Sequence, residues 1–162
     1  MKRRDFFKQL GSAALVAAAV TPTMSFAAAK KTGNEISYKD ALDAITGGKS
    51  AKTSAAVHLK APEIAENGAV VPITVTVDSP MTDADYVKSI HIIVSKNGNS
   101  RCIDAHLSPA NGKALLATRI KLNGTQDVSA VVGLSNGDFL IASQNVKVTI
   151  GGCGWSSTIF IN

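Results

Sequence analysis

The chain has 162 residues, a hydrophobic fraction of 45% and a charged fraction of 18%. This length allows one domain with an extension, and the composition excludes a wholly disordered protein. Two cysteines are too few for a disulfide-built miniprotein, or for a zinc or iron–sulfur site held by four cysteines. No apolar run reaches about 18 residues, so we expect no permanent membrane span.

Residues 1–27 have the anatomy of a signal peptide: a basic start, an alanine-rich apolar stretch and a small-x-small site at residues 25–27. The pair Arg3-Arg4 resembles the twin-arginine export motif. We therefore expect a mature periplasmic chain that begins at Ala28. The alternative, an amphipathic helix of the mature fold, is disfavoured because the apolar stretch has no polar face.

The formal net charge of +5 largely disappears with this leader. Its removal takes away four basic residues and one acidic residue, which leaves 13 Lys+Arg, 11 Asp+Glu and a formal charge of +2. Such a balance gives no support for a nucleic-acid partner. Export would also place the thiols in an oxidising compartment.

The mature chain begins with a small, polar segment that we expect to be loose, and a helix follows it. Ser37 precedes Asp40 in a capping-box-like start, and Gly47 is suited to end the helix. Apolar residues recur between them at helical spacing. The sequence therefore predicts one short helix at residues 38–46, followed by a polar linker at residues 47–54.

After residue 54 the hydrophobic period changes to two, which indicates β-strands. Ile93 interrupts the polar face of one of them. Five Asn-Gly pairs, at 67–68, 97–98, 111–112, 123–124 and 136–137, favour turns that need a positive φ. About eight strands are expected: near residues 55–59, 73–78, 90–95, 102–107, 116–122, 128–134, 139–141 and 146–150.

Short strands at this spacing predict an all-β fold, an antiparallel β-sandwich over residues 28–150 that includes the N-terminal helix. Residues 151–162 would then form a glycine-rich C-terminal arm and a tail.

Most enzyme motifs are missing from the sequence, including the P-loop, GxSxG, HExxH and CxxC patterns. Three histidines, His58, His91 and His106, fall in predicted strands and in principle provide enough ligands for a zinc or copper site. We favour ordinary strand histidines and expect no metal.

A second constellation joins Cys102, Asp104 and His106, which would share one face of a strand. This spacing could orient a thiol and an imidazole for nucleophilic catalysis. It also describes the solvent face of an amphipathic strand, which is the interpretation we favour.

The segment Gly151-Gly152-Cys153-Gly154 directly follows the last predicted strand. Glycine contributes no side-chain packing and adds backbone freedom, so three glycines around one cysteine are unsuited to a core. Two interpretations remain open on chemical grounds. The segment is a thin, pliable arm that presents a thiol to a partner, or its cysteine staples the C-terminus to the body.

The residues 146–154, VKVTIGGCG, resemble the carrier end of the SoxY family, which normally reads GGCGG. Further similar stretches occur in the same order along the chain. They are APEIAENG at 61–68, SPMTDAD at 79–85, VKSIH at 87–91 and TRI at 118–120. The resemblance covers roughly residues 37–154 and includes the twin-arginine leader.

This resemblance implies an immunoglobulin-like sandwich and a non-enzymatic, periplasmic sulfur carrier without a separate cofactor. Cys153 would attach thiosulfate-derived sulfur covalently, on an arm formed with Gly151, Gly152 and Gly154. A SoxZ-like subunit would complete a heterodimer. The implied enzymes are a SoxAX-like haem c enzyme that couples thiosulfate to the thiol, a SoxB-like hydrolase that releases sulfate and, where present, a SoxCD-like dehydrogenase.

The sequence departs from the family pattern in two ways. Trp155 replaces the usual second glycine, and eight residues follow Gly154 where the family normally ends almost at the cysteine. Cys102 matches no carrier position. The alternative hypothesis is therefore a SoxY-like binding or structural subunit that does not cycle sulfur. We expect Cys102 to be reduced and structural, with a reversible bridge to Cys153 as the minority interpretation.

Overall fold

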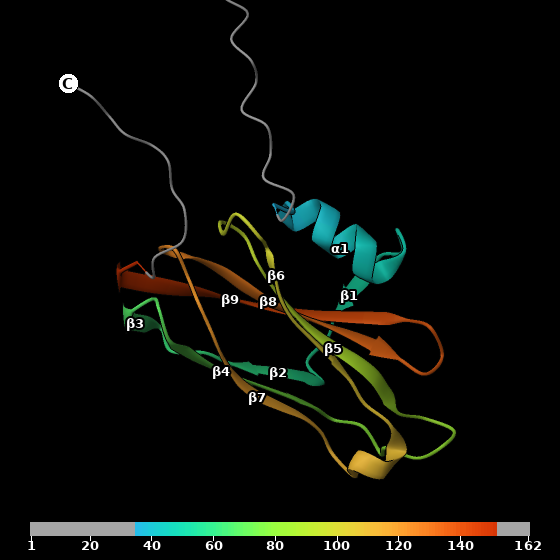
Figure 1. The fold of residues 1–162 in the computed structure, drawn as a ribbon. Coiled ribbons are helices and arrows are strands. Elements are labelled where there is room, and N and C mark those ends of the chain that lie inside the picture. Colours follow the sequence, from blue (N-terminus) through green and yellow to red (C-terminus); the bar gives the residue numbers. More distant parts are fainter. Residues whose placement is uncertain (1–34, 152–162) are drawn as a thin grey trace, which may run out of the picture. The chain divides into compact units, whose positions relative to one another are not determined.

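The computed structural model describes residues 35–151. The predicted signal peptide, and Gly152, Cys153, Gly154 and the tail after them, lie outside the described residues. Figure 1 shows the elements, which are α1 (Tyr38–Thr46), β1 (Ala51–Thr53), β2 (Val57–Lys60), β3 (Ile64–Asn67), β4 (Val71–Val77), β5 (Val87–Val94), β6 (Arg101–His106), the 3₁₀ turn η2 (Pro109–Asn111), β7 (Ala114–Ile120), β8 (Gln126–Leu134) and β9 (Phe139–Ile150).

The strands form two sheets. The larger sheet has the order β1-β9-β8-β5-β6, and β3 also pairs with β9; the smaller sheet has the order β2-β4-β7. Their facing sides supply the main core, because alternate residues of a strand point to the same face. Among the fully buried residues are Ile73, Val75, Ile90, Ile92 and Val128. Burial of each such side chain contributes about 1.5–3 kcal/mol. The predicted all-β sandwich is confirmed.

The pairing differs in detail from the prediction. β9 is one continuous strand where the sequence predicted two, and two short strands, β1 and β3, pair with it in parallel. The other pairs between named strands are antiparallel. Neither β1 nor β3 has an alternating apolar pattern, because each is only three or four residues long and mostly exposed.

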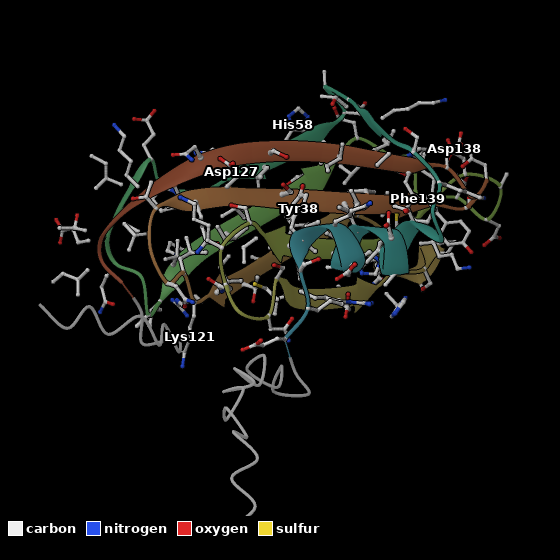
Figure 2. All side chains as sticks on the ribbon, turned by 90° about the horizontal axis from the view of Figure 1, so that it is seen from above. Tyr38, His58, Lys121, Asp127, Asp138 and Phe139 are labelled. Carbon is white, nitrogen blue, oxygen red and sulfur yellow. The ribbon has the colours of Figure 1, made fainter. Side chains whose placement is uncertain are left out.

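The helix forms over residues 38–46 as predicted. The Ser37 side chain accepts the Asp40 N–H at its start, and Gly47 ends it in the left-handed region at φ 63°. Figure 2 shows α1 lying across the outer face of the larger sheet, with Tyr38 and Phe139 near opposite ends of the helix. No helix within residues 35–151 has the length and hydrophobicity needed to cross a bilayer.

This position of α1 explains why Ile93 interrupts a polar face. Ile93 points away from the main core, yet it is fully buried in a second cluster with Ala41 and Val131. Leu42, Ile45 and Ile141 pack around this cluster. The outer face of the larger sheet is therefore apolar where the helix covers it.

The Asn-Gly pairs serve two structural purposes. Gly112 and Gly137 have the predicted positive φ, at 68° and 85°. Gly68, Gly98 and Gly124 do not. Asn97 and Asn123, which precede two of these glycines, both take part in hydrogen bonds that join two loops. Asparagine was therefore a correct indicator of loops but not always of turn type.

Candidate functional site

The end of β9 is fastened by three segments of the sandwich: β3, the β3–β4 loop and the β7–β8 loop. The Ile150 carbonyl accepts the Gly68 N–H at 2.7 Å, and the Gly68 carbonyl accepts the Leu122 N–H at the same distance. The Val148 N–H donates to the Thr125 hydroxyl at 3.0 Å. β3 also pairs with the last part of β9, with Asn67 opposite Ile150. Hydrogen bonds therefore fix β9 along its length as far as its final residue, Ile150.

Gly151, the first residue after β9, lies directly against the backbone of the β7–β8 loop. A Cβ atom at this position would collide with the Asn123 carbonyl oxygen. The absence of a side chain at Gly151 therefore permits close packing of the chain against this loop. The sequence predicted pliability at this residue, and the structure adds this packing requirement.

Two amide side chains hold the β7–β8 loop in place. The Asn97 Oδ1 accepts the Asn123 N–H at 3.1 Å and the Gln126 Nε2–H at 2.8 Å. The Asn97 Nδ2 donates to the Lys121 carbonyl at 2.8 Å. Gln126 is only 1% exposed, and its Oε1 accepts the Lys96 N–H at 2.7 Å. The platform beside Gly151 is therefore built from a fully paired polar network.

Sequence reasoning missed this network. Asn97 and Asn123 were interpreted only as turn formers, and Gln126 sits at the start of a strand with no apolar pattern of its own. A glutamine preceding an apolar strand, together with two Asn-Gly loops, was the available indication. It could not specify which loops would meet.

Cys102 has the properties of a packed, unreactive thiol. It packs against the main core, and burial raises its pKa to about 11. Its Sγ lies 4.0 Å from the Ser100 carbonyl oxygen, at the limit of a weak hydrogen bond. Because the thiolate is the nucleophile, a raised pKa disfavours sulfur chemistry at this position.

A bulge also separates Cys102 from Asp104 and His106. Ile92 pairs with Ile103 and Ile93 pairs with Arg101, so Cys102 is the extra residue of β6. The predicted shared face of Cys102, Asp104 and His106 is therefore wrong, since an inserted residue shifts the alternation of side chains.

We predict two free thiols per monomer in protein purified without reductant and then denatured. In the native protein, iodoacetamide should modify Cys102 about a hundredfold more slowly than an ordinary thiol, because a pKa about two units higher leaves proportionally less thiolate. Peptide mass mapping after timed labelling measures both. A chain two hydrogens lighter, without free thiols, would contradict the prediction.

The three histidines do not converge. His58 forms an exposed pair with Asp78 at 2.9 Å, whereas His91 is buried and lies 2.6 Å from an oxygen of Asp104. The His106 ring meets that of His91 edge-on, with ring centres 6.1 Å apart. Among residues 35–151, no group of three or more His, Cys, Asp or Glu side chains is arranged to hold a metal ion.

Asp104 instead organises a small electrostatic cluster on the outer face of β5 and β6. Its partial burial tends to raise its pKa, but hydrogen bonds with His91 and Arg101 and the charge of Arg101 outweigh this effect, and the pKa is lowered. The Arg101 Nε contacts both carboxylate oxygens at 2.9 Å. We interpret the cluster as structural.

The lowered pKa of Asp104 predicts a pH dependence of stability. A carboxyl group with a lower pKa in the folded state stabilises the fold above its unfolded pKa of about 3.9, and this contribution disappears as the pH falls through the folded value. Asp104→Asn should weaken this acid dependence of the free energy of unfolding. Urea titrations at a series of pH values measure it, with the exposed Asp43→Asn as control; equal curves for the two variants would refute the prediction.

Two facing sheets, a covering helix and a terminal strand that leads to a glycine-flanked cysteine define an immunoglobulin-like β-sandwich protein. A family model for the sulfur oxidation protein SoxY matches residues 42–153. The sulfur carrier protein SoxY from Chlorobium limicola f. thiosulfatophilum is 33% identical, with a TM-score of 0.59 over 69% of this chain and 96% of that one. The chain belongs to the SoxY family.

Similarity to superoxide reductases is limited to the fold. A superoxide reductase (neelaredoxin) from Ignicoccus hospitalis is 17% identical, with a TM-score of 0.51 over 57% of this chain and 81% of that one. A search of curated proteins gives no match. At this identity the reductase supports the sandwich architecture and nothing about chemistry.

Proposed function

We propose that this protein is a periplasmic sulfur carrier that binds thiosulfate-derived sulfur covalently on Cys153 and presents it to partner enzymes. The observation that carries the proposal is the position of Cys153, three residues beyond the fastened end of β9 at Ile150, in a chain of the SoxY family. Gly151, Gly152 and Gly154 form the carrier arm, and a SoxZ-like subunit completes a heterodimer. The carrier itself is not an enzyme.

The proposed loading step is an oxidative coupling. The Cys153 thiolate and thiosulfate join through a new S–S bond, which gives a cysteine S-thiosulfonate, and two electrons pass to a SoxAX-like haem c enzyme. A SoxB-like hydrolase then adds water across the bond between the sulfane sulfur and the sulfonate group. This releases sulfate and protons and leaves a persulfide on Cys153, which is a substrate for a SoxCD-like dehydrogenase.

The chemistry of the thiol suits a carrier whose reactions occur in its partners. An ordinary thiol with a pKa of about 8.5 is only a few per cent thiolate near neutral pH. In sequence, the cation nearest to Cys153 is Lys147, six residues away. The thiol is then activated in each enzyme's site, and the carrier contributes position rather than reactivity.

Intact mass spectrometry tests the proposal. Incubation with thiosulfate and the SoxAX-like enzyme should add one thiosulfonate group per chain, and peptide mapping should place it on Cys153. No adduct would favour the alternative of a non-cycling SoxY-like subunit. That alternative is supported by the bulky Trp155 and the tail, which depart from the family pattern.

We predict that the tail slows loading. Trp155 replaces a glycine, and the apolar residues 159–161 follow it, so the enzyme must admit a wider segment than a GGCGG end. Truncation after Gly154 should raise the initial rate of adduct formation severalfold. The rate is measured by mass spectrometry at limiting enzyme, and an unchanged or lower rate would show that the tail is neutral or helpful.

A further inference from the structure

Most of the exposed large hydrophobic side chains belong to β3, to the loop after it or to the end of β9. Within residues 35–151, the exposed large hydrophobic residues are Ile64, Val70, Leu115 and Ile150. Three of them lie at or near the fastening contacts: Ile150 ends β9 and accepts the Gly68 N–H, Ile64 begins β3 four residues before Gly68, and Val70 lies in the β3–β4 loop two residues after it. Figure 1 shows β3 and the end of β9 side by side at one end of the sandwich. The register places Ile64 opposite Lys147 and Ile150 opposite Asn67, so the Ile64 and Ile150 side chains point to opposite faces of the sheet. We call Ile64, Val70 and Ile150 the collar, because they lie around this end of the sheet rather than on one face of it.

The collar is exposed to an unusual degree for isoleucine and valine. Their exposed fractions are 62% for Ile64, 56% for Val70 and 67% for Ile150. Ile64 also lines a hollow of about 480 Å³ with Glu63, Gln144, Asn145 and Lys147. Ile64 is thus an exposed apolar side chain beside a hollow that is bordered by charges of both signs, a combination suited to protein docking.

The length of the arm determines what must cover this surface. Cys153 is two residues beyond Gly151, and an extended chain spans at most about 3.6 Å per residue, so their Cα atoms are separated by about 7 Å at most. Gly151 itself is packed against the Asn123 carbonyl and does not add reach. An enzyme that encloses the thiol must therefore bring the rim of its active site against the end of the sandwich.

We infer that the collar is the docking surface for the active-site rim of the enzyme that loads Cys153. The partner is a protein whose active-site opening is edged with apolar side chains, one of which enters the hollow beside Ile64. This inference rests on the proposed function. It assigns recognition to the body of the carrier as well as to the arm, and it places Ile64 and Val70 among the residues that determine which enzymes accept it.

Loading kinetics of the heterodimer test the inference with a matched control. Ile64→Thr keeps a β-branched side chain and Val70→Asp lies in a loop, so neither requires a change of fold. Leu115→Asp is the control, because it changes the fourth exposed hydrophobic residue at a distance from the collar. Ile120, at one end of β7, pairs with Val71 beside the collar, and Leu115 lies near the other end of β7. The probes are thiosulfate with the SoxAX-like enzyme and, separately, iodoacetamide.

Each collar variant should lower kcat/KM for adduct formation about tenfold, the effect expected of a docking contact, while Leu115→Asp stays near the wild-type value. The iodoacetamide rate at Cys153 should not change in any variant, since the thiol itself is untouched. Wild-type kcat/KM in the collar variants, or an equal loss in Leu115→Asp, would overturn the inference while leaving the carrier function in place.

Two other segments could cover the collar instead of the enzyme, the SoxZ-like subunit or the chain's own tail, and the same variants distinguish them. If collar variants no longer co-purify with the SoxZ-like subunit, the collar is the heterodimer interface and the inference is wrong. If they shift the emission of Trp155, the single tryptophan, to longer wavelength and speed the iodoacetamide reaction, the tail covers the collar instead. If wild-type protein is not loaded at all, the proposed function fails, and this inference fails with it.

Discussion

Cys153→Ser should abolish sulfur loading completely and leave the fold intact. The substitution removes the sulfur atom that forms the S–S bond to thiosulfate in the proposed loading step, and a serine hydroxyl cannot replace it. The other thiol, Cys102, is disfavoured because burial raises its pKa to about 11. Within residues 35–151 the two facing sheets already form the main core, and Cys153 lies beyond them in the sequence. Intact mass after incubation with thiosulfate and the SoxAX-like enzyme gives the loading, and circular dichroism gives the melting temperature.

Cys102→Ala is the matched control for this experiment. It removes the partly buried thiol with the raised pKa and should still accept one thiosulfonate group, at the cost of some stability from a small cavity. A Cys153→Ser protein that still gains the adduct would place the attachment site elsewhere. A Cys153→Ser protein that unfolds would show that the cysteine staples the C-terminus to the body.

The sequence predicted those parts of the fold in which local pattern and burial agree. The helix at residues 38–46 has a capping serine, a terminal glycine and one apolar face, and each of these features acts within a few residues. β4 and β7 alternate because one face of each is more buried than the other, whereas β5 and β8 are buried on both faces where α1 covers the larger sheet. β1 and β3 escaped prediction because their pairing with β9 comes from backbone hydrogen bonds, which any residue but proline can make.

The candidate site was predictable only as far as its chemistry is local. A cysteine between glycines can be recognised from the sequence, but the contact between Gly151 and Asn123 joins residues far apart in the chain. The extra residue in β6 was also hidden, because a bulge depends on how Ile92 and Ile93 pair with the neighbouring strand. Contacts between distant parts of the chain therefore determine two features: the loop against which Gly151 packs, and the separation of Cys102 from Asp104 and His106.

That platform is also where we expect the largest loss of stability from one surface-loop substitution. Asn97→Ala removes three hydrogen bonds at once: those to the Asn123 N–H, the Gln126 amide and the Lys121 carbonyl. Gln126 is 1% exposed, so its Nε2 loses its partner where water has little access. Leaving a buried polar group unpaired costs about 1–3 kcal/mol, more than the net value of one ordinary hydrogen bond.

We therefore predict that Asn97→Ala lowers the free energy of unfolding by about 2–4 kcal/mol, since one buried donor and two further loop contacts are lost together. Asn145→Ala, which removes a single exposed hydrogen bond to Asp127, should change it by less than about 1 kcal/mol. Urea denaturation measures both.

Amide exchange gives a second readout. Because Gly151 packs against the Asn123 carbonyl, the Asn97→Ala variant should also loosen the end of β9. Amide exchange at Ile150 and Gly151 should then be faster in Asn97→Ala than in Asn145→Ala. Equal stability and equal exchange in the two variants would show that the loop holds its position without Asn97, and that backbone pairing with β3 alone fastens the arm.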